Sequence, residues 1–172
     1  MMNAVHFLAF PKSFHNFEFN VEGKEILDRA LAKKRGVLFI TGHCGAWELL
    51  IAWLGVNKYP FEGVAAQQRN LGSNKHFQER REFFGVKHIF RSSSVETMIG
   101  TLKSKNILGI VSDQDAGPKG AFVSFFGKNA STPKGPAVFH LKTGAPMVFG
   151  TAFYEGQNTF HIHIQELNPK TN

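Results

Sequence analysis

Short apolar runs alternate along this chain with longer segments whose apolar residues recur at helical spacing. The apolar runs are rich in β-branched and aromatic residues, as buried strands are. They lie at 37–41, 63–67, 86–90 and 107–112. The segments with helical spacing lie at 23–34, 46–54, 70–84 and 94–103, and a short one follows at 136–142. Two further runs, 146–154 and 159–166, flank the turn residues 155–158 and predict a hairpin.

This alternation predicts an α/β fold with a mostly parallel, mixed sheet flanked by helices and an antiparallel strand pair at the C-terminal end. A chain of 172 residues, 42% of them hydrophobic, can bury one core, so we expect residues 1–172 to form a single domain. Ligands of such sheets bind beyond the carboxyl ends of the strands. Four polar residues follow predicted strands and are expected to share that edge. They are His43, Arg69, Arg91 and Asp113.

The charge of the chain narrows the choice of partners. Its net charge of +7 favours an anionic partner, such as nucleic acid, an anionic membrane surface or a phosphorylated substrate.

The single cysteine excludes an intrachain disulfide. The first residues lack the basic region of a signal peptide, and no apolar run approaches the roughly 18 residues of a spanning helix. Any association with a membrane is therefore expected to be peripheral.

The strongest candidate for chemistry is the turn that joins the strand 37–41 to the next helix. It carries His43, and Glu48 follows in the first turn of the helix. A carboxylate on one imidazole nitrogen fixes the tautomer, so that the other nitrogen can take a proton from a hydroxyl. Alternatively, His43 packs in the turn and Glu48 interacts with the helix dipole. The spacing alone does not distinguish these two interpretations. His161 and Glu166 have the same spacing, yet they lie in a predicted strand, where their side chains face opposite sides. Cys44 as a nucleophile is less favoured, because adjacent side chains rarely point at each other.

Other charged residues could bind substrate. Arg69 and Asn70 lie between a predicted strand and a polar helix, where an arginine can hold a phosphate, although a solvated surface arginine is equally consistent. Arg91 widens this basic field. Asp113 and Asp115 could orient Arg or His side chains, which we favour over metal binding because no third ligand is evident.

Three further features have alternative interpretations. The segment 122–128 places aromatics beside cations and could line an acyl-chain or membrane-facing groove, or form a core hairpin. Thr132 precedes a helix that begins near Pro136, whose free amides could bind an anion. His161 and His163 share one strand face, but a two-His metal site needs another ligand, so no metal is expected.

Several sequence blocks resemble the bacterial lipid A biosynthesis acyltransferases, the lauroyl/myristoyl enzymes of the wider acyltransferase superfamily with an H-x4-D/E signature. The first block is GVLFITGHCGAWEL at 36–49, and Arg69-Asn70 is similar to the second. ILGIVSDQDAG at 107–117, AFVSFFGKNASTPKGPA at 121–137 and TGAPMVFG at 143–150 follow in order. The resemblance as a whole covers about residues 20–167.

The resemblance implies a membrane-peripheral O-acyltransferase at the cytoplasmic face of the inner membrane. It implies transfer of a fatty acyl group from an acyl carrier protein or CoA thioester to a hydroxyl of a lipid A precursor. His43 would be the general base, Glu48 its orienting partner and Arg69 a phosphate ligand, with Asp113 and Asp115 supporting the site. No metal, organic cofactor or covalent acyl-enzyme is implied.

Two departures keep other functions open. Family members are longer, with an N-terminal anchoring helix and a C-terminal extension that we expect this chain to lack, and Cys44 and Ala46 differ from the usual residues around the dyad. The chain could instead be a non-catalytic module that binds lipid or acyl carrier protein. It could also acylate another glycolipid, such as a phosphoinositide mannoside. Only the net charge favours a nucleic-acid partner, and we do not expect one.

Overall fold

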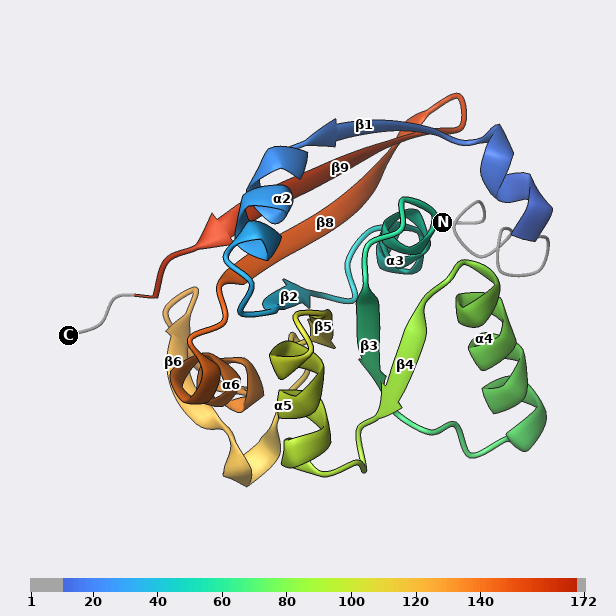
Figure 1. The fold of residues 1–172 in the computed structure, drawn as a ribbon. Helices are drawn as coiled ribbons and strands as arrows, with labels where there is room; N and C mark the ends of the chain where they lie inside the picture. The colour runs from blue at the N-terminus through green and yellow to red at the C-terminus, as the bar shows by residue number, and fades with distance from the viewer. Residues whose placement is uncertain (1–10, 170–172) are drawn as a thin grey trace.

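The computed structural model describes residues 11–169, which form one twisted sheet with helices packed on it and a small separate hairpin (Figure 1). In chain order the elements are η1 (Pro11–Asn16), β1 (Glu18–Glu22), α2 (Lys24–Ala32), β2 (Val37–Thr41), α3 (Trp47–Val56), β3 (Phe61–Ala65), α4 (Leu71–Phe83), β4 (Lys87–Phe90), α5 (Val95–Lys103), β5 (Ile107–Val111), η2 (Gly117–Lys119), β6 (Ala121–Phe125), β7 (Lys128–Thr132), α6 (Gly135–Thr143), β8 (Met147–Gly156) and β9 (Thr159–Leu167). Among these residues, no helix combines the length and apolar character needed to cross a membrane.

The main sheet has seven strands in the order β1-β9-β8-β2-β5-β3-β4. All neighbouring pairs are parallel except β8 and β9, which form the antiparallel C-terminal pair. The predicted fold class is therefore confirmed. The predicted elements are present with their ends shifted by only a few residues.

The core is built around β2, whose residues Val37, Leu38 and Phe39 are completely buried. Because side chains alternate across a strand, Phe39 packs into the cluster under α2 and α3, while Leu38 packs into the cluster under α5 and α6. The neighbouring strand β8 has a glycine beside the Phe39 ring. A Cβ atom on Gly150 would lie 2.2 Å from the ring of Phe39, so only glycine fits there.

Three strands were not assigned from the sequence. Strand β1 pairs in parallel with β9 and forms one edge of the sheet, joining the N-terminal and C-terminal parts of the chain (Figure 1). The alternation of residues in β1 is too short to predict a strand, and only the structure shows that it pairs with β9. The segment 122–128, for which a groove lining and a core hairpin were both considered, belongs to the antiparallel pair β6–β7, a two-stranded sheet of its own that is mostly exposed.

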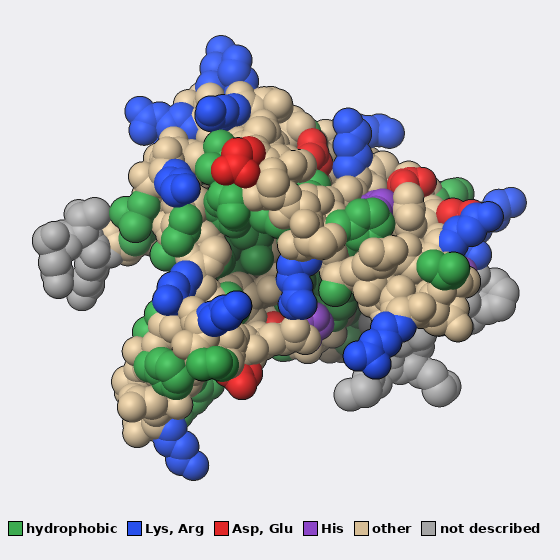
Figure 2. Space-filling model, turned by 90° about the horizontal axis from the view of Figure 1, so that it is seen from below, with side chains coloured by type: hydrophobic (Ala, Val, Ile, Leu, Met, Phe, Trp, Pro, Cys, Tyr) green, Lys and Arg blue, Asp and Glu red, His purple; other side chains and the backbone are tan. Residues whose placement is uncertain are grey.

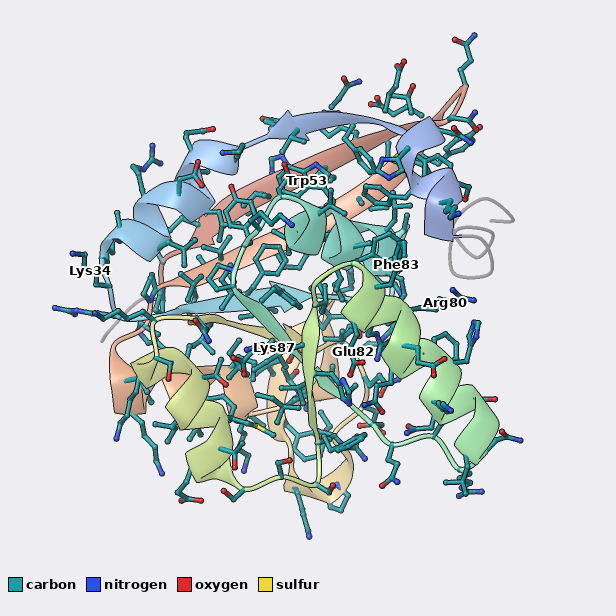
Figure 3. All side chains as sticks on the ribbon, turned by 45° about the vertical axis from the view of Figure 1, so that its right-hand side comes forward. Lys34, Trp53, Arg80, Glu82, Phe83 and Lys87 are labelled. Carbon is teal, nitrogen blue, oxygen red and sulfur yellow. The ribbon has the colours of Figure 1, made fainter. Side chains whose placement is uncertain are left out.

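The connections carry several residues with positive φ. Between α2 and β2, Lys34 and Gly36 have φ values of 55° and 69°, and the Lys34 side chain projects from the surface (Figure 3). A Cβ atom at Gly36 would lie 2.6 Å from a backbone oxygen, so this tight turn requires glycine.

Candidate active site

The turn between β2 and α3 is held against two strands of the sheet. The backbone N–H of Ala46 donates to the carbonyl of Ala152 on β8 at 2.7 Å. Gly45 has φ 61°, and a Cβ atom there would lie 2.2 Å from the same carbonyl oxygen, so this close approach requires glycine. This turn presents His43 beyond the carboxyl end of β2.

His43 is hydrogen-bonded to Asp113. The Nδ1 atom of His43 lies 2.8 Å from one carboxylate oxygen of Asp113, and the backbone N–H of His43 donates to the other at 2.6 Å. The two residues meet because β2 and β5 are parallel neighbours, with Thr41 opposite Val111. The Trp47 ring packs edge-on at 5.2 Å from the imidazole. The ring is therefore oriented, and Nε2 is the nitrogen left for a substrate.

The Asp113 carboxylate is stabilised in its charged form. Partial burial raises the pKa of this carboxyl, but hydrogen bonds from the side chain and backbone of His43 outweigh burial and lower the pKa below its usual value. The resulting contribution to folding stability is present above the ordinary aspartate pKa of about 3.9 and is lost as the pH falls through the lowered value. At neutral pH Asp113 is an anion that stabilises an imidazolium at His43.

Glu48 has a different partner. Its carboxylate accepts two hydrogen bonds from Arg81 of α4, from Nη2 at 2.5 Å and from Nε at 3.3 Å. The two side chains are only 13% and 19% exposed. Thus the carboxylate hydrogen-bonded to His43 is Asp113, and not Glu48 as the spacing suggested. A catalytic role for Glu48 stays a prediction, and such a role would involve Arg81, to which its carboxylate is hydrogen-bonded.

A cavity of about 860 Å³ opens beside His43 and Glu48. It lies outside the carboxyl ends of β2, β5, β3 and β4, where ligands of parallel sheets bind. Its apolar wall includes Ile51, Phe61, Val64, Phe77, Ile110 and Phe139. Figure 2 shows a deep hollow with hydrophobic side chains inside and Lys and Arg side chains around it. The volume falls within the range of about 300–1,000 Å³ that is typical of ligand pockets.

The structure divides the other predicted site residues into two groups. Arg91 and Asp115 line the cavity with His43 and Glu48. Asp115 also accepts a hydrogen bond from the backbone N–H of Gly117 at 2.9 Å, which shapes the loop after β5. Of the four residues expected to share this edge, His43, Asp113 and Arg91 follow the parallel strands β2, β5 and β4 there, whereas Arg69 does not line the cavity.

Arg69, Asn70 and Thr132 are not among the described residues that line the cavity. The side chain of Asn70 accepts from the backbone N–H of Ser73, so it caps α4. Arg69 is exposed directly before this cap. Substrate binding by these three residues stays a prediction.

Most residues of the cavity wall were not singled out from the sequence as site residues. Among them are the polar or aromatic residues Trp47, Arg81, His88 and Gln114. Arg81 belongs to a polar helix without a motif, and His88 lies in a short strand, so neither carries a local signal. Trp47 and Gln114 each lie within a recognised block, at 36–49 and 107–117.

A histidine–aspartate pair at the edge of a parallel sheet, beside a deep apolar cavity, is an arrangement suited to transfer of a group with a long apolar chain. The chain belongs to the bacterial lipid A biosynthesis acyltransferase family, whose model matches residues 1–170. It is also similar to two curated mycobacterial proteins, both named phosphatidylinositol mannoside acyltransferase. It is 26% identical to that of Mycobacterium tuberculosis (strain ATCC 25618 / H37Rv) over 80% of this chain. It is 28% identical to that of Mycolicibacterium smegmatis over 74% of this chain. The matched regions cover 45% and 43% of these relatives, so the chain spans less than half of their length.

Proposed function

We propose that this protein transfers a fatty acyl group from a thioester to a hydroxyl of a glycolipid. The observation that carries this proposal is the His43 imidazole, held by Asp113 at the mouth of an apolar cavity. Membership of the acyltransferase family supports the same reaction.

The chemistry requires one base. Nε2 of His43 takes the proton of the acceptor hydroxyl while the hydroxyl oxygen attacks the thioester carbonyl carbon. The carbon–sulfur bond then breaks, and the imidazolium returns the proton to the leaving thiolate. Asp113 stabilises the imidazolium between these steps. No covalent acyl-enzyme is needed, because the thioester is already activated.

The cavity wall fits the acyl chain. One part of the wall consists of aliphatic and aromatic side chains, and burying a methylene group against them contributes about 0.8 kcal/mol. The acyl group would lie among Ile51, Val64 and Phe139, with its carbonyl at His43. The donor is proposed to be acyl carrier protein or CoA.

The acceptor is proposed to be an anionic, phosphorylated glycolipid. Arg91 lines the cavity mouth and Arg69 lies exposed before α4, and a guanidinium can bind a phosphate with two parallel hydrogen bonds. The name of the family favours a lipid A precursor as acceptor. The names of the mycobacterial relatives motivate a phosphatidylinositol mannoside as the second candidate.

The test is an assay of the purified protein with acyl-acyl carrier protein or acyl-CoA and each of the two acceptors, followed by mass spectrometry of the lipids. We expect one acceptor to gain the mass of one acyl chain, with repeated turnover. Binding of donor and acceptor without any acylated product would instead support the non-catalytic module.

We further propose that the β6–β7 hairpin docks on the membrane that holds the acceptor. Its Phe122, Phe125 and Phe126 are 65%, 64% and 93% exposed, and Lys128 follows them. Phe126 occupies a turn position with φ 50°, where asparagine or glycine is favoured over a bulky ring. The turn conformation itself therefore does not favour the ring, which packs edge-on against that of Phe125 at 4.6 Å, whereas at a membrane it would bury apolar surface beside cations.

This gives a prediction with opposite effects on two quantities. Phe126→Asn should leave thermal stability unchanged or raised, because asparagine tolerates positive φ, while binding to anionic vesicles falls about tenfold or more. The measurements are thermal unfolding and cosedimentation with phosphatidylglycerol vesicles. Phe83 at the end of α4 is 58% exposed and lies away from the hairpin (Figure 3), so Phe83→Asn is the matched control. Equal loss of binding in both variants would contradict docking by the hairpin.

A further inference from the structure

Two histidines and a glutamate converge on the sheet at the edge opposite to β4. His161 and His163 lie on one face of β9, and Glu22 lies at the end of β1. In the parallel register of these strands Glu22 is directly opposite His163. The sequence places the two histidines together but separates them from Glu22 by more than a hundred residues, so only the pairing of β1 with β9 supplies the third ligand.

The distances in this cluster match the edges of a tetrahedral metal site. The Nε2 atom of His161 lies 3.4 Å from Oε2 of Glu22, and the Nδ1 atom of His163 lies 3.2 Å from the same oxygen. All three ligand atoms lie within 4.8 Å of one another. Ligand atoms 2.0–2.2 Å from a tetrahedral zinc ion are about 3.3–3.6 Å apart.

A second layer of hydrogen bonds orients His161. Its Nδ1 atom lies 3.1 Å from Oε1 of Glu155 on β8. The side-chain amide of Asn20 donates to the other oxygen of Glu155, also at 3.1 Å. The Glu155 carboxylate favours the neutral tautomer with the proton on Nδ1 of His161, and in that tautomer the Nε2 lone pair faces Glu22. This carboxylate–histidine arrangement is typical of histidines that bind metal.

A cation, either a proton or a metal ion, is needed between His161 and Glu22. When the imidazoles are neutral, the Nε2 lone pair of His161 points at a carboxylate oxygen that is also an acceptor. Either a proton on the imidazole or a metal ion must neutralise this arrangement. His161 and His163 are 37% and 41% exposed, and Glu22 is 65% exposed, so an ion can reach all three.

We propose that Glu22, His161 and His163 bind one divalent transition-metal ion, with zinc as the ion best matched to two imidazoles and one carboxylate. Water completes the tetrahedron. The ion joins the edge strand β1 to β9. Through the antiparallel pair β8–β9 it supports the strand whose Ala152 carbonyl holds the active-site turn. The site is structural and lies outside the cavity.

The test is isothermal titration of the protein, free of any histidine tag, with zinc chloride at pH 7.5, with magnesium chloride as the comparison. We expect one zinc ion per chain, a rise in the midpoint of thermal unfolding and no binding of magnesium. Cobalt should give the visible absorption of a tetrahedral site. Affinity should fall as the pH is lowered, because zinc binds the neutral form of an imidazole and competes with the proton.

Variants assign the ligands. His163→Gln and Glu22→Gln should each weaken zinc binding by more than 100-fold, and Glu155→Gln, which removes only the orienting carboxylate, by about 10–100-fold. His76→Gln changes an exposed histidine of α4 and should have no effect. Circular dichroism confirms that each variant is folded. Zinc binding that stays unchanged in His163→Gln and Glu22→Gln, or the lack of saturable one-to-one binding, would overturn the site and leave a proton-mediated cluster.

Discussion

Replacing His43 by alanine is expected to lower kcat for acyl transfer by about 10²–10⁴-fold, the range for loss of a general base, while the protein stays folded. His43 is 41% exposed on a turn, so its removal leaves no cavity in the core. The measurement is initial rate with acyl-acyl carrier protein at saturating acceptor, together with circular dichroism. KM should change little, because the imidazole acts on the reacting proton and contributes little to binding.

A neighbouring variant is the control for this prediction. Cys44→Ala alters the adjacent exposed residue and should leave the rate unchanged, which would also exclude Cys44 as a nucleophile. Asp113→Asn should reduce kcat by an intermediate factor, because the ring keeps a hydrogen-bonding neighbour but loses the charge that stabilises the imidazolium. Undiminished transfer by His43→Ala would reject the proposed mechanism.

Breaking the Glu48–Arg81 pair is expected to reduce stability more than any other change at the site. The pair has two hydrogen bonds and is largely buried, so a lone partner would be a charged group without compensation. We expect Glu48→Gln and Arg81→Gln each to lower the free energy of unfolding by about 1–3 kcal/mol. The double variant should lose less than the sum of the two, as measured by urea unfolding in a double-mutant cycle.

The same variants test whether Asp113 or Glu48 orients and stabilises the imidazole of His43. Asp113→Asn should lower kcat with little loss of stability, since both members of its pair are about 40% exposed. Glu48→Gln should lower stability, and we expect Arg81→Gln to reproduce its effect on the rate, because the Glu48 carboxylate is hydrogen-bonded to this arginine at the cavity wall. If Glu48→Gln lowers kcat as Asp113→Asn does while Arg81→Gln does not, Glu48 serves His43 directly and the proposed roles are exchanged.

The separation of these roles shows how the fold arranges a motif. Glu48 lies in the first turn of α3, near His43 in sequence, but its carboxylate faces α4 and meets Arg81. Asp113 lies seventy residues from His43 and reaches it because β2 and β5 are parallel neighbours. A fixed spacing along the chain places two residues near one turn, whereas the direction of each side chain depends on what packs against it.

Local patterns were enough to predict the elements of the main sheet. The residues 37–40 are all apolar, as suits a strand that is buried on both faces, and this signal is contained in a few consecutive residues. The helices from α2 to α5 follow from the spacing of their apolar residues, and the cap residues Asn70 and Ser94 mark where two of them begin. The edge strand β1 and the hairpin β6–β7 have weaker patterns, because much of their surface is exposed.

The sequence by itself thus determined the α/β class, the membership suggested by its ordered blocks, and the presence of His43 at the end of a strand. These properties depend on hydrophobic periodicity and on short motifs, which are local. Only the tertiary structure decided that Asp113 holds the imidazole, that Arg81 holds Glu48, and that Glu22 joins His161 and His163. Each of these contacts links residues on different elements, and their meeting depends on strand order and helix packing, which no local pattern contains.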